Sequence, residues 1–285
     1  MAVHSATTWL DPIPGLWRDE AAHRYWLGDH LFPVSITGVL AYGLSDYAKR
    51  SIEAKRPIWE PRGTIVHAAL EHYSQARFLA GKSAREALLD AETLCGHHQY
   101  RDWILPLLQL PLWDEVEVIA SERLSCCLTR NVAGAFDGAY VSRALSERRG
   151  HEVRVLYDLK TLSAHGRPYS TAAQLGGYMV LEAAQGNHYE LGQTIWSKPG
   201  EAFTSTFYSR EKCLAAWAAA WSRYCSAHRP SESKDQREPA KQTGLQMLAA
   251  RLSGLGIVRA TVLMFLDGGP PACCCSPSPS RRCGN

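Results

Sequence analysis

An aspartate and a lysine two positions apart are the first residues that could do chemistry. Asp158 and Lys160 stand in the run VRVLYDLKTL, residues 153–162. In a strand, residues i and i+2 point to the same face, so the carboxylate and the ammonium would project together from one side of a sheet. Alone, the pair is better explained by an ordinary ion pair worth at most about 1 kcal/mol. A catalytic role therefore requires partners from elsewhere in the chain.

A second acid lies in the preceding strand candidate. Asp137 stands in AGAFDGAY, residues 133–140, next to small residues that allow a ligand to approach closely. If the two strands pair antiparallel, Asp137 and Asp158 can converge on one point. Two carboxylates about 4–5 Å apart repel by about 3–4 kcal/mol at an effective dielectric constant near 20, so they need a cation. Oxygen ligands without thiolates select Mg²⁺ or Mn²⁺ over zinc.

Two further residues are candidates for the same site. His67 lies on a predicted helix upstream, and an imidazole there can complete a metal shell made otherwise of carboxylates. Glu122, in VIASERL, could add a ligand or accept a hydrogen bond from one, and it could equally form a salt bridge at a sheet edge. The sequence leaves both interpretations of Glu122 open.

Gln174 and Tyr178 are four residues apart in QLGGYM, so one helix face would present an amide and a phenol. Gly176 and Gly177 lie between them, and each weakens a helix by about 1 kcal/mol relative to alanine. A helix that keeps two glycines there is expected to be approached closely by another chain or a ligand.

The surrounding pattern predicts the elements that must position these residues. HRYWLGDHLFPVS indicates a hairpin around residues 28–29, and Ser35 or Thr37 is expected to cap the helix that follows. Helical periodicity is also present in four later segments, at residues 61–80, 83–109, 169–186 and 210–228. Strand patterns cover residues 114–128, 131–144, 152–162, 190–198 and 202–210, the last two as a hairpin that turns at Pro199 and Gly200.

This order predicts an α/β fold with a central mixed sheet flanked by helices. Trp217, Trp221 and Tyr224 have the spacing of a core stripe. Residues 1–60 are expected to form an N-terminal hairpin and helix within the catalytic domain, and residues 61–229 to form its core. Residues 230–285 are expected to be a linker, a short helix at 245–255 and a low-complexity tail.

Composition excludes several classes of protein. The 285 residues are 46% hydrophobic and 21% charged with a net charge of +3, which is typical of a globular protein and not of a polycation. No apolar run is long enough to span a bilayer and no secretory signal is visible, so we expect an intracellular, cytoplasmic protein without membrane partners. The nine cysteines lack zinc-site spacing and are expected to stay reduced.

Four motifs in register carry a family resemblance. GTIVHAALEHY, AGAFDGAY, YDLKT and AAQLGGYM resemble the PD-(D/E)xK nuclease superfamily in its RecB-like exonuclease branch, which includes phage and mitochondrial genome maintenance exonucleases. The resemblance implies a restriction-endonuclease-like core in which His67, Asp137, Asp158 and the carbonyl of Leu159 bind Mg²⁺ or Mn²⁺, with Glu122 as a further candidate. It also implies catalytic roles for Asp137, Asp158 and Lys160, and substrate contacts for Gln174, Tyr178, Arg62 and Thr161.

The expected activity is metal-dependent hydrolysis of phosphodiester bonds at DNA ends, in recombination, repair or phage DNA processing. The DNA would be single-stranded or carry free ends, a helicase or recombination partner stays unidentified, and a phage-encoded source is compatible with the resemblance. Some relatives carry an iron–sulfur cluster, but Cys213 and Cys225 lack partners at the required spacing, so none is expected. A restriction-like endonuclease and a non-catalytic DNA-binding scaffold are the alternatives.

Overall fold

The computed structural model describes residues 8–95 and 98–228. Contacts between Cα atoms divide the chain into two units, Met1–Arg229 and Pro230–Asn285. The predicted linker, the helix at residues 245–255 and the cysteine-rich tail lie outside the described residues. Everything below concerns the first unit.

Helices make up about half of the described elements and differ widely in length. In chain order they are α1 (Ile36–Tyr42), α2 (Asp46–Ala54), α3 (Arg56–Ser74), the π-helix η1 (Gln75–Leu79), α4 (Ala84–Cys95), the 3₁₀-helix η2 (His98–Tyr100), α5 (Arg101–Leu108), α6 (Leu112–Glu115), α7 (Arg143–Arg149), α8 (Ala172–Ala183) and α9 (Arg210–Ala227).

The strands fall into a small and a large sheet. They are β1 (Leu16–Asp19), β2 (Arg24–Leu27), β3 (His30–Leu31), β4 (Val34–Ser35), β5 (Val116–Cys127), β6 (Val132–Ser142), β7 (Arg154–Thr161), β8 (Leu191–Lys198), β9 (Glu201–Thr204) and β10 (Tyr208–Ser209). The first three form a small antiparallel sheet at the N-terminus.

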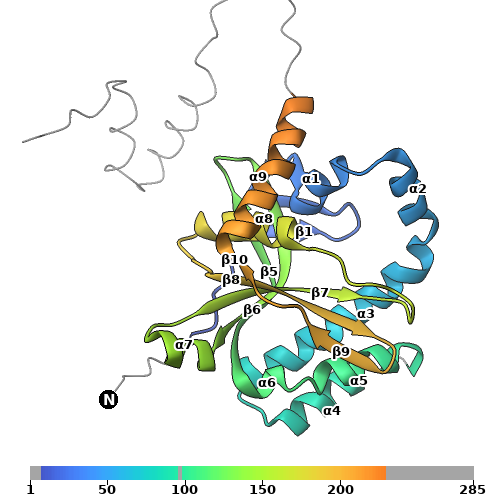
Figure 1. Cartoon of the computed structure of the whole chain (residues 1–285), viewed down its shortest axis with the longest axis vertical. Coiled ribbons are helices and arrows are strands. Elements are labelled where there is room, and N and C mark those ends of the chain that lie inside the picture. The colour runs from blue at the N-terminus through green and yellow to red at the C-terminus, as the bar shows by residue number, and fades with distance from the viewer. Residues whose placement is uncertain (1–7, 96–97, 229–285) are drawn as a thin grey trace, which may run out of the picture. The chain divides into compact units, whose positions relative to one another are not determined.

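The large sheet is mixed, as the sequence predicts. Strands β5, β6 and β7 pair antiparallel in chain order, and β8 then joins β7 in parallel after the crossover through α8. Short strands complete the sheet, since β4 pairs in parallel with β6, and β9 and β10 pair antiparallel with β8. The result is an α/β fold whose central mixed sheet is flanked by helices (Figure 1).

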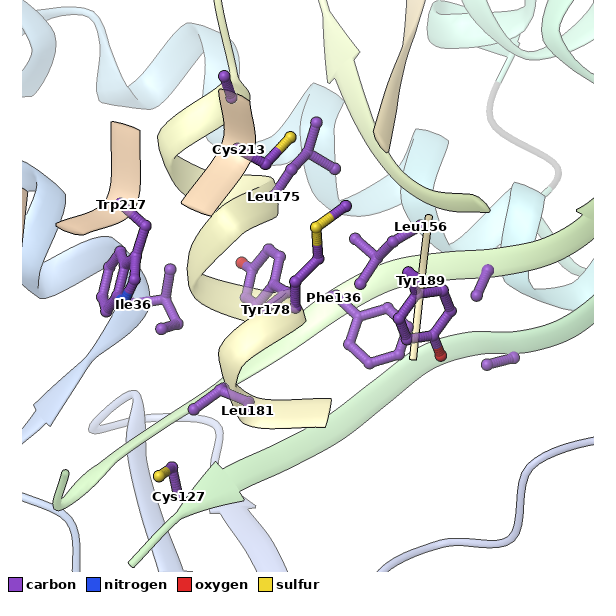
Figure 2. Close-up of a cluster of buried hydrophobic side chains, with 14 of the residues drawn as sticks. Ile36, Cys127, Phe136, Leu156, Leu175, Tyr178, Leu181, Tyr189, Cys213 and Trp217 are labelled. Atoms are coloured by element: carbon purple, nitrogen blue, oxygen red, sulfur yellow. The ribbon is translucent and has the colours of Figure 1, made fainter. Parts of the chain in front are cut away.

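Helices cover both faces of the large sheet. One face packs against α1, α8 and α9, and we name its buried side chains the α8 cluster, which includes Phe136, Leu156, Tyr178 and Trp217 (Figure 2). The other face packs against α3, α4 and α5, and its buried side chains, among them Tyr157, form the α3 cluster. Residues on successive positions of β7 alternate between the clusters, as the pleat requires.

Several local predictions from the sequence are confirmed. The hairpin of β2 and β3 turns at residues 28–29, and the side chain of Ser35 accepts a hydrogen bond from the amide of Gly38 at the start of α1. The turn at Pro199 and Gly200 joins β8 to β9. Trp217 is 1% exposed and stacks on Trp221, as expected for a core stripe.

The boundaries differ in places where local caps interrupt a long periodic pattern. The helix expected after Ser35 is two helices, because Ser45 caps a new one by accepting a hydrogen bond from the amide of Ala48. The segment at residues 83–109 likewise divides into α4, η2 and α5. The connection between β6 and β7 contains α7, and β1 and β4 are strands that the sequence pattern did not predict.

The two glycines of α8 serve the packing of the chain against itself. A Cβ atom at Gly176 would lie 2.0 Å from the carbonyl oxygen of Cys213 in α9, and one at Gly177 would lie 2.9 Å from the side chains of Ile36 and Trp217. The expected close approach is therefore made by α9 and α1 of the same chain, and the expectation of another chain or a ligand is wrong at these positions.

We expect Gly176→Ala to destabilise the fold by about 1–3 kcal/mol, because overpacking outweighs the gain in helix propensity. Gly63→Ala in α3 is the matched control, since a Cβ atom there meets nothing within 4 Å. That control should stabilise the protein by about 0.5–1 kcal/mol. Urea unfolding measures both, and equal effects of the two substitutions would contradict the packing argument.

Two further features follow from the described residues. Among the described residues, Cys126, Cys127 and Cys213 are buried thiols and Cys225 is a partly buried one, and the expected reduced state of the nine cysteines stays a prediction. Among the helices in the described part of the chain, none combines the length and the apolar character that crossing a membrane requires.

Candidate metal centre

Three acids stand at the same level in three neighbouring strands. Ser121 pairs with Gly138 and Arg123 with Phe136, which places Glu122 of β5 directly opposite Asp137 of β6. The pairing of β6 with β7 ends at Gly138 and Tyr157, so Asp137 and Asp158 are the next residues of the two strands. The ladder opens at this level, and the backbone amide of Leu159 donates to the Asp137 carboxylate instead of to a strand carbonyl.

The backbone of β5 is distorted at this level. Glu122 has a φ of 44°, which lies in the left-handed region that side chains other than glycine adopt at a cost of about 1–3 kcal/mol. The register of β5 against β6 also shifts between Val118 and Ala120, which marks a β-bulge. These irregularities aim the Glu122 side chain at α3, while its neighbour Arg123 turns to Glu182 of α8.

His67 of α3 meets the two acids that face it. Its Nδ1 atom lies 3.2 Å from Oε1 of Glu122 and 3.3 Å from Oδ1 of Asp137. One donor atom from each of the three residues lies within 4.8 Å of the other two. We name these residues, His67, Glu122 and Asp137, the triad. Glu122 makes an ion pair with His67 from a strand that, in the described part of the chain, pairs only with β6, so a metal ligand and a salt-bridge residue at a sheet edge both stay open for it.

Asp158 and Lys160 form an ion pair beside the triad. The Lys160 Nζ atom donates to Oδ1 of Asp158 at 2.8 Å, and Asp158 is 0% exposed. The other carboxylate oxygen of Asp158 is buried and has no hydrogen-bond partner among the described residues. The pleat places both residues on the α8 side of β7, so Asp158 adjoins the triad across the opening between β6 and β7 without belonging to the triad.

The charges of the site act on one another. Burial disfavours the charged imidazolium, but Asp137 and Glu122 outweigh it and raise the pKa of His67 to about 10. Burial raises the pKa of Asp158 to about 6, while Lys160 opposes the rise and Asp137 adds to it. His67 and Lys160 hold the pKa of the buried Asp137 below its usual value. The three acids of the site therefore face two cationic side chains, His67 and Lys160, and a metal ion bound at the triad would take the place of the proton on Nδ1 of His67.

The donor set fits a divalent cation. One imidazole nitrogen and two carboxylates converge from α3, β5 and β6, and no thiolate is among them. The unpartnered oxygen of Asp158 is a buried acceptor next to this group, and an unpaired buried acceptor is costly unless something positive satisfies it. Hard oxygen ligands with an imidazole suit magnesium or manganese better than metals that prefer sulfur.

The other predicted site residues lie around this centre. The carbonyl of Leu159 has no contact that bears on metal binding, so its role stays a prediction. Arg62 is 8% exposed, lies over the ring of Trp103 at 5.3 Å and donates from Nε to Oγ1 of Thr161 at 3.2 Å. Arg62 therefore fixes the end of β7 to α3 and α5, which limits the part of its guanidinium that a substrate could reach.

Gln174 and Tyr178 lie on α8 and hydrogen-bond to each other, with Nε2 of Gln174 donating to the phenol oxygen at 3.1 Å. Tyr178 is 3% exposed and packs on Phe136, one residue before Asp137. Burial is the main cause that raises the pKa of Tyr178, and the nearby charges of Asp158 and Asp137 add to it. The pair supports the site from behind, and its contact with DNA stays a prediction.

A buried ion pair next to the triad was not anticipated from the sequence. Arg123, the residue after Glu122, is 9% exposed, and its Nε atom lies 3.3 Å from Oε1 of the fully buried Glu182. Arg123 also donates to the carbonyl oxygens of Leu10 and Asp11. The available signal was an arginine within a predicted strand, three positions before the first of two adjacent cysteines.

Comparison with known proteins gives no assignment. No family model matches the chain, and no curated protein matches it. The superfamily resemblance therefore stays a prediction that depends on the motifs, and the functional argument depends on the geometry above.

The strained backbone of Glu122 allows a direct test of its role. Glu122→Gly should raise the free energy of unfolding measured in EDTA by about 1 kcal/mol, because relief of the left-handed strain outweighs the loss of the partly exposed ion pair with His67. The same substitution should weaken Mn²⁺ binding about tenfold or more in calorimetric titration. Glu122→Gln is the control that keeps the strain. Unchanged Mn²⁺ affinity in both variants would remove Glu122 from the site.

Proposed function

We propose that the chain is a metal-dependent DNA exonuclease with a restriction-endonuclease-like core, as the resemblance to the RecB-like branch of the PD-(D/E)xK superfamily implies. The observation that carries the proposal is the convergence of His67, Glu122 and Asp137 beside the ion pair of Asp158 and Lys160. Motifs that lie far apart in the sequence supply one compact group whose chemistry suits phosphodiester hydrolysis.

The residues of the site would have two roles, binding a divalent cation and stabilising the charge of the transition state. The triad would hold Mg²⁺ or Mn²⁺, with the free oxygen of Asp158 and the carbonyl of Leu159 as additional candidates. Such a cation would act as a Lewis acid on the phosphate and would lower the pKa of a nucleophilic water. The hydrogen bond from the Leu159 amide to Asp137 fixes the orientation of the central carboxylate.

Lys160 supplies the positive charge that the transition state needs. Its side chain is 21% exposed, so the ammonium can be reached from outside, and the 2.8 Å contact with Asp158 fixes its place. Negative charge grows on the phosphate oxygens during hydrolysis, and a positioned cation stabilises it more than mobile solvent does. The acids raise the pKa of Lys160 despite its burial, which keeps the side chain charged.

The order of elements also supports the proposed core. Helix α3 precedes three antiparallel strands, and the crossover through α8 leads to a parallel fourth strand. This arrangement brings the three acids to one level and lays the amide and phenol of α8 behind them. DNA as the substrate would put the protein inside the cell, the cytoplasmic location that we expect from the sequence.

The experiment that tests the proposal compares linear and circular single-stranded DNA with Mg²⁺ and with EDTA. We expect degradation of the linear strand alone, and only with Mg²⁺. Cutting of circles would favour the endonuclease alternative, and binding without loss of DNA would favour the scaffold. Degradation that persists in EDTA would contradict the metal-dependent mechanism.

A further inference from the structure

A loop of ten residues, 162–171, crosses from the end of β7 to the start of α8 beside Lys160. Both of its ends are fixed. The amide of Leu162 donates to the carbonyl of Ser197 at 2.7 Å, and the indole of Trp103 donates to the carbonyl of Leu162, also at 2.7 Å. At the other end, the hydroxyls of Thr171 and Thr194 lie 2.6 Å apart.

Tyr169 in this loop is exposed although it is held in place. Its exposed fraction is 56%, yet its ring lies 5.1 Å from that of Trp196 in an edge contact, and Trp196 is 1% exposed. Trp196 is the register partner of Lys160 in the parallel pair of β7 and β8. The buried Trp196, next to the catalytic lysine, therefore holds the exposed ring of Tyr169 at the edge of the site.

The loop also carries a cationic side chain and an imidazole close to Tyr169 in the sequence. His165 and Arg167 alternate with Tyr169 along the loop, both are exposed, and neither has an ion-pair partner among the described residues. Burial is the main cause that raises the pKa of Tyr169. Its hydroxyl also lies within electrostatic reach of Lys160, which opposes the rise, and of Asp158, which adds to it. Aromatic rings interleaved with basic side chains are typical of surfaces that bind single-stranded nucleic acid.

We propose that Tyr169 is a stacking platform for an unpaired nucleobase of the strand whose phosphate lies at Lys160. The ring fits a base because it is flat, exposed and held without having to be ordered on binding. The positive charge of Arg167 matches the negative charge of the adjoining backbone, and the imidazole of His165 can donate a hydrogen bond to it. This inference rests on the proposed function and specifies its substrate class, a single strand with an unpaired base at the site that can unstack from its neighbours.

Duplex DNA does not offer this contact directly, because its bases are paired and stacked on one another. A blunt duplex can bring its phosphates to the basic side chains but cannot place a base on Tyr169 without first being opened. The ring should therefore contribute to the binding of single strands and contribute little to the binding of blunt duplexes.

The experiment measures the Kd of the full-length protein for a fluorescent single-stranded oligonucleotide by anisotropy. It is done in EDTA, and again in Mg²⁺ with a hydrolysis-resistant phosphorothioate strand. Tyr169→Ala should weaken binding about 5- to 100-fold, the range that one base–aromatic stack gives. Tyr169→Phe keeps the ring and should bind as the wild type does. Phe207→Ala is the control, since Phe207 is 43% exposed but lies before Tyr208, which pairs with Gly192 at the far end of β8.

A second arm removes the base instead of the ring. A series of strands carries one abasic site each, at successive positions from the end. At the position that contacts Tyr169, the loss of affinity from the abasic site and the loss of affinity from Tyr169→Ala should not be additive. For a blunt duplex, Tyr169→Ala should leave the Kd unchanged. Thermal melting of each variant checks that the fold is kept, as expected for a residue that is more than half exposed.

The outcomes separate the inference from the proposed function. If the wild type degrades linear DNA and binds single strands, and Tyr169→Ala binds them equally well, the inference is overturned and the proposed function stands. Equal losses in Tyr169→Ala and Tyr169→Phe would also overturn it, because they would assign the effect to the hydroxyl. A wild type that neither binds nor degrades DNA would remove both.

Discussion

Asp158→Asn is expected to reduce Mg²⁺-dependent hydrolysis of DNA by at least about a thousandfold, which corresponds to about 4 kcal/mol of lost transition-state stabilisation. The amide has the shape of the carboxylate but carries no charge, so it offers less to a cation and holds Lys160 less firmly at the 2.8 Å contact. The measurement is the rate of release of nucleotides from a linear strand at saturating Mg²⁺.

The fold should survive this substitution. Lys160 loses its partner, but its side chain is 21% exposed and lies near the charge of Asp137, so the loss of stability is smaller than for a fully buried ion pair. Asp90→Asn is the control, because Asp90 forms an ion pair with Lys82 at the surface and should leave the rate unchanged. A rate for Asp158→Asn within tenfold of the wild type would count against the assigned site.

Glu182→Gln is expected to lower the free energy of unfolding by about 3–5 kcal/mol, the largest loss of stability that we predict. Glu182 is 0% exposed and accepts hydrogen bonds from Arg123, Asn187 and Tyr189. Its substitution leaves the Arg123 guanidinium buried without an opposite charge. Removing one member of a buried ion pair costs far more than the pair itself contributes, because the remaining charge keeps its desolvation penalty.

The matched control for this prediction is a surface ion pair. Glu190 lies 2.5 Å from Arg149 and 2.8 Å from His151, and its side chain is 37% exposed. Solvent screens such pairs, so Glu190→Gln should cost less than about 1 kcal/mol. Urea unfolding at one pH gives both values. Similar small losses in the two variants would show that Arg123 finds other partners, and the predicted contribution of the buried ion pair to stability would be wrong.

The sequence was sufficient to predict the elements that carry the site. Apolar alternation predicted β5, β6 and β7, and helical periodicity predicted α3 and α8, because each segment buries one face and shows this in its pattern. The parallel strand β8 followed as a short apolar run after α8. Caps at Ser45 and breaks within residues 83–109 were harder to predict, because a local hydrogen bond can end a helix without changing its periodicity.

Part of the candidate site could also be predicted from the sequence pattern. Antiparallel pairing of β6 and β7 brings Asp137 and Asp158 to the same level. This placement can be predicted by counting residues along the two strands once their register is assumed. The convergence of His67 with Asp137 depended on tertiary packing, which a single sequence does not specify. The left-handed Glu122 had no signal at all, since nothing in the residue type indicates a positive φ.

Tyr169 and the glycines of α8 show two limits of prediction from a single sequence. Gly176 was correctly singled out as a point of close approach, but the approaching group is the backbone of α9, and composition cannot name a neighbour that is distant in the chain. Tyr169 was expected to begin the helix at residues 169–186, but α8 begins at Ala172, and the contact with Trp196 places Tyr169 beside Lys160.

The most direct test of the metal centre is anomalous X-ray diffraction from crystals of the protein soaked in Mn²⁺. The account predicts one strong peak between His67, Glu122 and Asp137, at coordination distance from a carboxylate oxygen of each acid, and its loss in crystals of Asp137→Asn. Crystals that show no peak at these residues, or a peak bound to other side chains while the triad keeps its direct contacts, would contradict the account.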